Sequence, residues 1–583
     1  MRRERPRLRS PPGLWAECEA ILRLERHCPA TQKANLPGDV YQVYHWIERL
    51  DYRDGEGRDC QPGAIRCQET DARGQTSTSA WSTNPYWTYE NHMHSVICPH
   101  GTPSHSRTGD FRKASGPGHL AGSATALGVC VLLLLGGGTG QGAPALRPVA
   151  EVEEDVYTYE PADNGAGPMW CSGSTCLVRS GTNVFASGLE TLKDLKPLNN
   201  CRWLLFERGG GGWQLAQADP SGRTREPCPL AGFPDGSLFL SANPTLTPSN
   251  AYAGPARPEI LRFRAGDARA PSQRLLPVWD GNPDFTEHSY RSFAADGPAG
   301  ELILFQNIGS THAQWTFRDR AGNWAVQGKL AWPYGAEYPK PEPVRVCYPN
   351  VALKNRAVYF CGVSDIVEPY PEWRAYKKQL TGRDWDYDFR RLFYTWTPDI
   401  TREKFRDWIE IASRDQTCGW ISPGDLWVGP DGTVHLLWTE RALDERLRPK
   451  FFPQARQSHL LNYAIVRQGQ VVLRRTLLAS HEGGSMEIPL AARFQATPDN
   501  RLLVILYVQG TGRNGEAVSE NRLLEMHANG EPGTAVRIPF KRPFTSFFTA
   551  TVRAGSPPSS TLDILGQRSG TPLAVSYARV RLW

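Results

Sequence analysis

The feature that most constrains the fold of this chain is an internal repeat that runs from about residue 180 to the C-terminus. Seven times, a turn that often reads Asp-Gly is followed by a short apolar run, at intervals of roughly 55 to 77 residues. The seven units are Ser180-Gly181 with NVFASG, Asp235-Gly236 with SLFLSA, Asp296-Gly297 with ELILFQ, Lys354-Asn355 with AVYFCG, Asp431-Gly432 with TVHLLW, Asp499-Asn500 with RLLVILYV, and Ser559-Ser560 with TLDILG. Self-similarity at this period, with several short strands in each unit, is typical of a β-propeller.

The stretch from Phe285 to Leu330 shows the pattern of a single blade most clearly. Turn residues at Asp296-Gly297, Gly309-Ser310 and Ala321-Gly322-Asn323 divide it into short apolar runs, which predicts four antiparallel strands. A third strand follows the hairpin in every unit, from RWLLFER in the first to AVSYARV in the last. A fourth strand follows in most units, for example GWQLAQA and WAVQGKL.

The last unit ends at Trp583 with only three strands. The segment Asp155 to Glu160, DVYTYE, precedes the first unit and is expected to supply the missing strand, because ring closure removes exposed strand edges. The predicted fold is therefore all-β: a seven-bladed β-propeller of four-stranded antiparallel blades, with an N-terminal strand closing the last blade. The alternative is a pair of irregular β-sandwiches.

Composition agrees with a turn-rich β protein and narrows the partners. The chain has 583 residues with 19 Trp, 47 Pro and 55 Gly, a composition that argues against long helices. The formal net charge of +6 comes from 66 basic and 60 acidic residues, with no block of one sign beyond the Arg-rich first ten positions. We expect no nucleic-acid partner.

The stretch from Gly122 to Ala145 has the order of a secretory signal. Arg112 and Lys113 precede an apolar run from Ala126 to Leu135, which small residues follow. That run is shorter than the roughly 20 residues needed to span a bilayer. We therefore predict a signal peptide or signal anchor at 111–145, a propeller at 146–583, and a secreted or periplasmic protein that is membrane-bound only if the signal is not cleaved.

Residues 1–110 show no sustained periodicity, and their cysteines fit no metal-ligand spacing. The interpretation we favour is that translation starts further downstream, at Met93 or near Arg112, so that this region is mis-predicted. The alternative is a disordered cytoplasmic tail ahead of a signal anchor.

Seven cysteines follow the predicted signal. Cys347 and Cys361 flank the predicted turn at Lys354-Asn355, so a hairpin would place them on adjacent strands and an exported protein would allow a disulfide. Weaker pairings are Cys171 with Cys176 and Cys201 with Cys228, whereas Cys418 is expected to be a buried thiol. No cofactor is expected: there is no C-x-x-C pair, and no loop has the D-x-D-x-D-G spacing of a calcium site, although a structural Ca²⁺ is compatible with such folds.

Candidate functional residues gather at the predicted starts of the innermost strands, which converge on the propeller axis. They mix aromatic rings that stack on sugars with charged groups that bind acidic substituents. The candidates for substrate binding are Glu287, Arg291, Arg345, Arg391, Trp420 and Glu487, and the same ends also carry Trp170, Glu226, Tyr290, Asp425 and Phe544. Several of these are equally well explained as core or turn residues.

Three residues are candidates for catalysis: His288, His312 and Tyr348. The loop between the second and third strands rises on the same face as the start of the inner strand, so both imidazoles and the phenol are expected to face one pocket. A neutral His or a Tyr takes the proton next to a uronate carboxylate, a Tyr returns one to the leaving oxygen, and Arg345 or Arg291 neutralises the carboxylate. A purely structural role for each His is the alternative.

Two insertions are expected to form the walls of a cleft. The larger one, Glu368 to Phe389, lies in the fourth unit, and the second, Arg441 to Ser458, lies in the fifth. Insertions in propellers tend to fall on one face and to shape the binding surface.

Three segments resemble a known family: Glu287 to Asn323, the VCYPNVAL hairpin, and YTWTPDITREKFRDWIEI. They are similar to the BNR-repeat, sialidase-like seven-bladed propellers, in particular the branch with polysaccharide lyases that act on ulvan-type uronic acid polymers. The resemblance extends from about residue 160 to the end and is carried by the middle third. It implies catalytic roles for His288, His312 and Tyr348, with Arg345 or Arg391 as the arginine partner.

The chain departs from true sialidases in two ways. The Asp-box survives only in part, as Thr397-Pro398-Asp399 and Trp408, and the Arg triad of sialidases is not recognisable. Sialic acid hydrolysis is therefore disfavoured, whereas a glycosidase that uses Glu226, Glu287 or Glu487 stays open. The sequence predicts a monomeric, exported propeller that acts on a polysaccharide or oligosaccharide as a lyase or related glycosidase; the alternative is a non-catalytic glycan- or protein-binding propeller.

Overall fold

The computed structural model describes residues 66–70, 76–80 and 145–583, except residues 172 and 485. The chain divides into two compact units, Met1–Gly142 and Ala143–Trp583. In the first unit, β1 (Arg66–Thr70) pairs antiparallel with β2 (Thr76–Ala80). The predicted signal segment and the rest of region 1–110 lie outside the described residues.

The second unit contains seven four-stranded antiparallel sheets, as the repeat predicts. Blade 1 is β4 (Leu177–Ser180), β5 (Asn183–Thr191), β6 (Cys201–Gly209) and β7 (Gly212–Ala218). Blade 2 is β8 (Leu230–Gly232), β9 (Ser237–Ala242), β10 (Glu259–Arg264) and β11 (Gln273–Leu275). Blade 3 is β12 (Arg291–Asp296), β13 (Glu301–Ile308), β14 (His312–Arg318) and β15 (Trp324–Ala331). Blade 4 is β18 (Val346–Lys354), β19 (Ala357–Ser364), β22 (Arg391–Thr397) and β23 (Ile409–Ser413).

The C-terminal half continues the same order. Blade 5 is β24 (Trp420–Val428), β25 (Val434–Arg441), β26 (Ser458–Arg467) and β27 (Gln470–His481). Blade 6 is β28 (Met486–Ala496), β29 (Leu502–Thr511), β30 (Ala517–Met526) and β31 (Val536–Arg537). Blade 7 is β32 (Phe544–Thr549), β33 (Thr561–Arg568), β34 (Ala574–Arg581) and, from the other end of this unit, β3 (Val149–Thr158).

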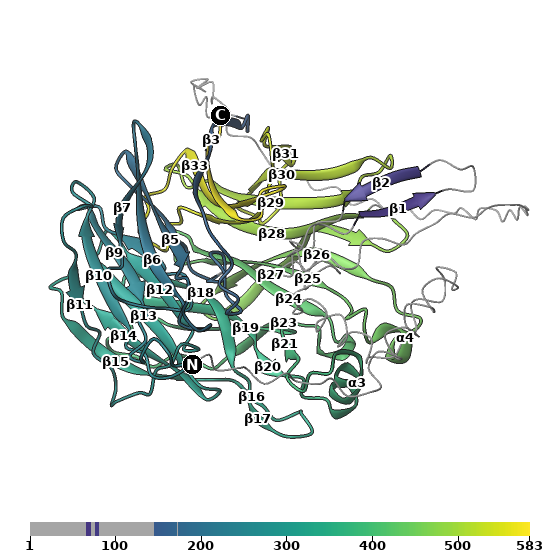
Figure 1. Cartoon of the computed structure of the whole chain (residues 1–583), viewed down its shortest axis with the longest axis horizontal. Helices are drawn as coiled ribbons and strands as arrows, with labels where there is room; N and C mark the ends of the chain where they lie inside the picture. The colour runs from purple at the N-terminus through teal and green to yellow at the C-terminus, as the bar shows by residue number, and fades with distance from the viewer. Residues whose placement is uncertain (1–65, 71–75, 81–144, 172, 485) are drawn as a thin grey trace, which may run out of the picture. The chain divides into compact units, whose positions relative to one another are not determined.

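The first strands of neighbouring blades touch one another in a closed ring. Contacts run from β4 to β8, β12, β18, β24, β28 and β32, and from β32 back to β4. These seven strands therefore line the axis, and the colours of Figure 1 pass in order from blue through teal and green to yellow around it. The seven-bladed propeller predicted from the repeat is confirmed.

The N-terminal strand closes the ring, also as predicted. β3 pairs antiparallel with β34 from Val149 opposite Arg581 to Thr158 opposite Ala574, which is a longer match than the DVYTYE segment alone. β34 is therefore paired on both sides, by β33 and by β3, and the last blade has four strands like the others.

The hairpins form where their turn residues demand. In blade 4, Lys354 lies opposite Ala357, and Asn355 and Arg356 both adopt positive φ (49° and 66°). Two consecutive residues at positive φ make the tight turn whose twist matches that of the flanking strands, and Asn tolerates this geometry well. The Asp-Gly turns use the Asp side chain instead: Asp235 Oδ1 accepts from the Ser237 amide at 2.8 Å.

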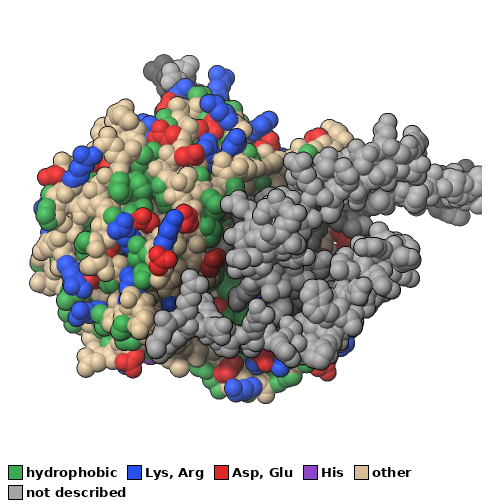
Figure 2. Space-filling view, viewed as in Figure 1, with side chains coloured by type: hydrophobic (Ala, Val, Ile, Leu, Met, Phe, Trp, Pro, Cys, Tyr) green, Lys and Arg blue, Asp and Glu red, His purple; other side chains and the backbone are tan. Residues whose placement is uncertain are grey.

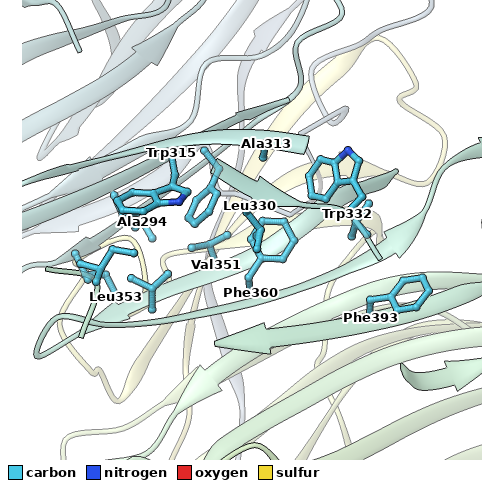
Figure 3. Close-up of a cluster of buried hydrophobic side chains, with 14 of the residues drawn as sticks. Ala294, Ala313, Trp315, Leu330, Trp332, Val351, Leu353, Phe360 and Phe393 are labelled. Atoms are coloured by element: carbon cyan, nitrogen blue, oxygen red, sulfur yellow. The ribbon is translucent and has the colours of Figure 1, made fainter. Parts of the chain in front are cut away.

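The core lies between the faces of neighbouring blades. Between blades 3 and 4, Trp315, Leu330 and Phe360 pack with Val351 and Phe393, and all are buried (Figure 3). The second strand of a blade is also buried on both faces: β9 of blade 2 reads SLFLSA, and all six of its residues are buried. This explains why the sequence shows continuous apolar runs rather than strict alternation.

A buried arginine ties the blades together at the axis. Arg553, from the connection between β32 and β33, donates to Gly173 O (2.7 Å), to Asp425 Oδ1 (2.9 Å) and to Asn350 Oδ1 (3.0 Å). Gly173 packs so closely that a Cβ there would lie 2.3 Å from Pro349 O and 2.5 Å from Tyr348 O. The loop before β4 and the β32–β33 connection therefore meet inside the ring.

The two predicted insertions both join the second and third strands of their blades, and they touch each other. The first holds β20 (Ile366–Val367), α3 (Pro371–Thr381) and β21 (Tyr387–Asp388), and the second holds α4 (Arg448–Phe451). Trp373 of α3 packs on Phe452 at 5.6 Å between ring centroids, and α3 and α4 lie at the same edge of Figure 1. A short ribbon, β16 (Tyr334–Gly335) with β17 (Glu342–Pro343), joins blades 3 and 4.

The disulfide predictions are not supported. All seven cysteines between 171 and 418 are buried free thiols. Cys347 and Cys361 do lie on paired strands, but Cys347 opposes Val363 and Cys361 opposes Asn350, because the two cysteines are at unequal distances from the turn, where Lys354 pairs with Ala357. Cys171 and Cys176 are the nearest pair, with their sulfurs 3.5 Å apart, which is longer than a disulfide bond of about 2.05 Å.

Within the described residues, no helix is long and apolar enough to cross a membrane. The same residues contain no group of three or more His, Cys, Asp or Glu side chains arranged to hold a metal ion. On the described part of the face shown in Figure 2, acidic and basic side chains lie interspersed.

Candidate functional site

The starts of β8, β12 and β18 bring seven polar and aromatic side chains together at one end of the axis. We call them the axial cluster: Arg225, Glu226, Glu287, His288, Tyr290, Arg345 and Tyr348. The first two precede β8, the next three precede β12, and the last two begin β18 or directly precede it.

His288 lies between an arginine and a carboxylate. Its Nδ1 is 2.5 Å from Arg225 Nη1, and its Nε2 is 3.4 Å from Glu287 Oε1. Burial, and next the charge of Arg225, lower the pKa of His288, so the ring is neutral at pH 7. Because a guanidinium only donates, Nδ1 accepts and the ring proton resides on Nε2, which faces Glu287. In this arrangement Nδ1 already accepts from Arg225 and Nε2 already carries the proton, so the predicted role of His288 as a base requires the ring to leave Arg225.

Two buried carboxyl groups accompany the histidine. Burial, and to a smaller extent the neighbouring Glu287, raises the pKa of Glu226 to about 7, although Arg291 and Arg225 oppose the shift. Glu226 Oε1 is buried and has no hydrogen-bond partner among the described residues, and Arg225 Nη1 is 3.8 Å away. Glu287 is anchored through Oε2, which accepts from the Gly254 amide at 3.1 Å. Glu226 therefore titrates near neutral pH, beside a second, anchored carboxyl group.

Tyr348 occupies a strained backbone position. Its φ is 50°, at the point where the register of β18 shifts between Cys347 and Asn350. A non-glycine residue at positive φ costs free energy and persists only where the surroundings enforce it, here through Gly173, which packs against the Tyr348 carbonyl. Burial raises the pKa of Tyr348 well above its ordinary value, and no hydrogen bond of its hydroxyl is found within the described part of the chain.

Aromatic rings extend from Tyr348 in three directions. Its ring centroid is 5.8 Å from Tyr290, 5.9 Å from Trp170 and 6.0 Å from Phe389. Phe389 in turn packs on Trp420 at 4.6 Å. Trp420, one of the predicted substrate-binding residues, is therefore joined to the axial cluster through Phe389.

The two arginines nearest these rings have different tasks. Arg345 forms an ion pair with Asp365 (2.9 Å), and its guanidinium lies 5.7 Å from the Tyr290 ring centroid. Arg291 is held by the segment before β8, because its Nη2 donates to Pro227 O at 2.5 Å. Arg345 thus remains a candidate for binding an acidic group, while Arg291 clamps the segment that carries Glu226.

Two other sequence candidates lie apart from the axial cluster. His312 begins β14, where its Nδ1 contacts Thr311 Oγ1 at 2.8 Å; burial and Lys329 lower its pKa. Glu487 forms an ion pair with Arg522 at 2.8 Å in blade 6, and that hydrogen bond lowers the pKa of Glu487. No contact found in the described part of the chain joins either residue to His288 or Tyr348.

Arg391 belongs to a different site on blade 4. It forms ion pairs with Glu337 and Glu410 at the edge of a cavity of about 530 Å³. The cavity is lined by Glu337, Tyr370, Arg391, Glu410, Ser413, Arg414, Asp415, Gln416 and Thr417. Both guanidinium groups in this lining are already paired with carboxylates, since Arg414 donates to Glu440 at 2.8 Å.

Sequence reasoning missed Arg225, Asp365 and Phe389. Arg225 directly precedes Glu226 and was discoverable from its position before an inner strand. Asp365 directly precedes β20, and Phe389 directly follows β21. The pairing of β20 with β21 therefore brings both residues beside the axial cluster, where Asp365 meets Arg345 and Phe389 meets Tyr348. No local pattern in the sequence marks that pairing.

Comparisons with known proteins show what this chain is similar to. No family model matches the chain, and no curated protein matches it. Among solved structures, a protein of unknown function from Dyadobacter fermentans is 11% identical over 76% of this chain and 100% of its own, with a TM-score of 0.36. An α-L-arabinanase of Penicillium chrysogenum in complex with arabinobiose is 11% identical over 75% of this chain and 98% of its own, with a TM-score of 0.35. An α-L-arabinofuranosidase of Fusarium graminearum in complex with an iminosugar inhibitor is 12% identical over 60% and 91%, with a TM-score of 0.34.

Similarity at this level carries no information on activity. The seven-bladed fold rests on the strand pairing described above, and the finer resemblance to the BNR-repeat and ulvan-lyase branch stays a prediction.

Proposed function

We propose that this protein is a carbohydrate-active enzyme that breaks a glycosidic bond at the axial cluster. The observation that carries the proposal is a pair of neighbouring buried carboxyl groups, Glu226 and Glu287. Burial raises the pKa of Glu226 to about 7, and its Oε1 has no hydrogen-bond partner among the described residues. A carboxyl group of this kind is a suitable proton donor, and carboxyl groups in unlike environments are typical of acid–base pairs.

Hydrolysis follows from this arrangement. Glu226 gives its proton to the glycosidic oxygen as the bond to the anomeric carbon breaks, and Glu287 either attacks that carbon or removes a proton from the attacking water. His288 Nε2, which lies 3.4 Å from Glu287 Oε1, helps to orient this carboxyl group. Tyr290, Tyr348 and Trp170 offer ring faces on which a sugar stacks.

A second candidate reaction, β-elimination from a uronate-containing glycan, is favoured by Tyr348. Its hydroxyl is protonated, makes no hydrogen bond among the described residues and is held on a strained backbone. In this reaction Tyr348 returns a proton to the leaving oxygen, Arg345 binds the uronate carboxylate, and His288 takes the proton from the adjacent carbon after its ring leaves Arg225.

One experiment separates these reactions from simple binding. The full chain is incubated with neutral polysaccharides and with uronic-acid polysaccharides, and two products are followed: new reducing ends, and the ultraviolet absorbance of an unsaturated uronate. Reducing ends without the absorbance support hydrolysis, and both signals together support elimination. Binding to a glycan without either product would contradict the enzymatic proposal and leave a binding propeller.

Variants then assign the residues. For hydrolysis we expect Glu226→Gln to lower kcat by a factor of about 10² to 10⁴, which is the usual contribution of a positioned proton donor. For elimination the corresponding loss is expected in Tyr348→Phe. Glu487→Gln is the matched control, because it removes a carboxylate whose partner, Arg522, lies in blade 6.

We also propose that the protein is exported to a secreted or periplasmic location. The signal-like stretch from Gly122 to Ala145 supports this. N-terminal sequencing of the protein isolated from its native host tests it, and a mature chain that retains residues before 122 would contradict a cleaved signal.

A further inference from the structure

One exposed aromatic ring, that of Tyr252, borders the axial cluster on the blade 2 side. The connection 243–258 between β9 and β10 docks beside Glu287, because the Gly254 amide donates to Glu287 Oε2 (3.1 Å) and the Ala256 amide donates to Phe285 O (2.8 Å). Tyr252, two residues before Gly254, is 57% exposed. No packing of its ring against another aromatic ring is found in the described part of the chain.

Two more exposed rings, those of Tyr387 and Trp385, border the cluster on the blade 4 side. The insertion returns to the axis where Val367 pairs with Tyr387, and the Tyr387 ring centroid lies 5.5 Å from the Arg345 guanidinium. Tyr387 is 38% exposed, and Trp385, two residues earlier, is 57% exposed. The guanidinium of Arg383 lies 5.2 Å from the Trp385 ring centroid.

His288 comes from the blade between these two borders. Its side chain is 48% exposed, whereas Glu226 and Glu287 are almost fully buried. Large exposed rings that make no core contact are the groups that proteins use to stack on the apolar faces of sugars. Rings on blades 2 and 4, with His288 of blade 3 between them, therefore form a row rather than a single pocket.

We propose that this end of the propeller binds a linear glycan of several sugar units, which passes from Tyr252 on blade 2 over His288 to Tyr387 and Trp385 on blade 4. The inference rests on the proposed function, since it assumes that the axial cluster takes a carbohydrate, and it names the substrate class as a long chain cut within its length. A trisaccharide reaches only the centre of the row and gains little from its ends.

Binding without turnover tests the row directly. In a Glu226→Gln background, the dissociation constants of arabinan, polygalacturonate and alginate are measured by affinity electrophoresis, and those of the matching trisaccharides by calorimetry. For the polymer that binds, we expect Tyr252→Ala and Trp385→Ala each to weaken binding roughly tenfold, in line with the loss of one stacking contact. Binding of the trisaccharide is expected to change less than twofold.

Three further variants serve as controls for effects on the fold rather than on stacking. Tyr334→Ala is the matched control, because Tyr334 is 61% exposed and its hydroxyl donates to Pro341 O within its own ribbon. Tyr387→Phe keeps the ring and is expected to bind the polymer as the parent does, whereas Tyr387→Ala is not. Thermal unfolding of each variant confirms that the fold is retained.

The outcomes separate this inference from the proposed function. If the polymer is cleaved but Tyr252→Ala and Trp385→Ala bind it like the parent, the row is wrong and the enzymatic function stands. If both variants lose polymer binding while Glu226→Gln and Tyr348→Phe retain full turnover, the row stands and the catalytic assignment fails. If none of the three polymers binds better than its trisaccharide, the long-chain inference is overturned.

Discussion

At the scale of single residues, the most informative group is Glu226. Its pKa of about 7 in the folded protein, against an ordinary value of 4.5, means that the native state binds this proton more tightly than the unfolded state. The stability that the group contributes is fully present below pH 4.5 and is lost as the pH rises to 7. Over that window the free energy of unfolding should fall by about 3 kcal/mol on account of this residue.

Glu226→Gln removes the titration and keeps the shape. We therefore expect the variant to be more stable than the parent at pH 8 and to show a flatter dependence between pH 5 and 7, as measured by chemical denaturation. Glu487→Gln serves as the comparison, because the pKa of Glu487 is lowered by its bond to Arg522 and its effect has the opposite sign. An unchanged pH dependence in Glu226→Gln would show that Glu226 is ionised in the native protein.

Arg225 sets the protonation of His288. After burial, its charge is the next contribution that lowers the pKa of the imidazole, and Glu287 opposes it. In Arg225→Gln we expect the pKa of His288 to rise toward its ordinary value of 6.5, because one cation is removed and the carboxylate remains. An NMR titration of the imidazole measures this shift, and a pKa that stays the same or falls would contradict the assignment.

At the scale of elements, the loop before β4 supports the strained start of β18. Gly173 lies against the carbonyl oxygens of Tyr348 and Pro349, and both obstacles are backbone atoms that cannot rotate away. Gly173→Ala is expected to destabilise the protein by about 2–3 kcal/mol, as overpacking does, and to reduce activity at Tyr348. Gly167→Ala, in the same lead-in segment, is the control because a Cβ there meets nothing within 4 Å. Equal unfolding midpoints for the two variants would contradict the close packing of Gly173 against the start of β18.

The same scale shows what sequence could and could not predict. Turn residues and apolar runs predicted the seven hairpins, because each is decided within about ten residues. The series of ring contacts from Tyr290 through Tyr348 to Trp420 depends on Phe389, the last residue of a 22-residue insertion. His312 was placed near His288 by loop order alone, and the structure puts it on the third strand with Thr311 and Lys329 as neighbours. Radial distance from the axis is a tertiary property that spacing does not encode.

At the scale of the whole molecule, the ring depends on contacts between residues more than 400 positions apart. Val149 opposes Arg581 and Thr158 opposes Ala574, so the first strand of the propeller completes its last blade. The sequence predicted this closure because the seventh unit lacks a strand and a closed ring leaves no inner edge. The seven cysteines between 171 and 418 are free thiols and provide no covalent closure. The non-covalent pairing of β3 with β34 therefore carries the closure.

Removing β3 tests this dependence. A chain that begins at residue 160 leaves β34 with one unpaired edge and exposes the side chains of blade 7 that Ala150 and Val152 cover. We expect lower thermal stability, a broader unfolding transition and concentration-dependent aggregation, because a long exposed strand edge pairs with other chains. A chain that begins at residue 143 keeps β3 and is the control. Addition of a synthetic peptide spanning residues 146–160 should restore the sharp transition in the shorter chain, whereas identical unfolding of the two chains would show that the ring is stable without its closing strand.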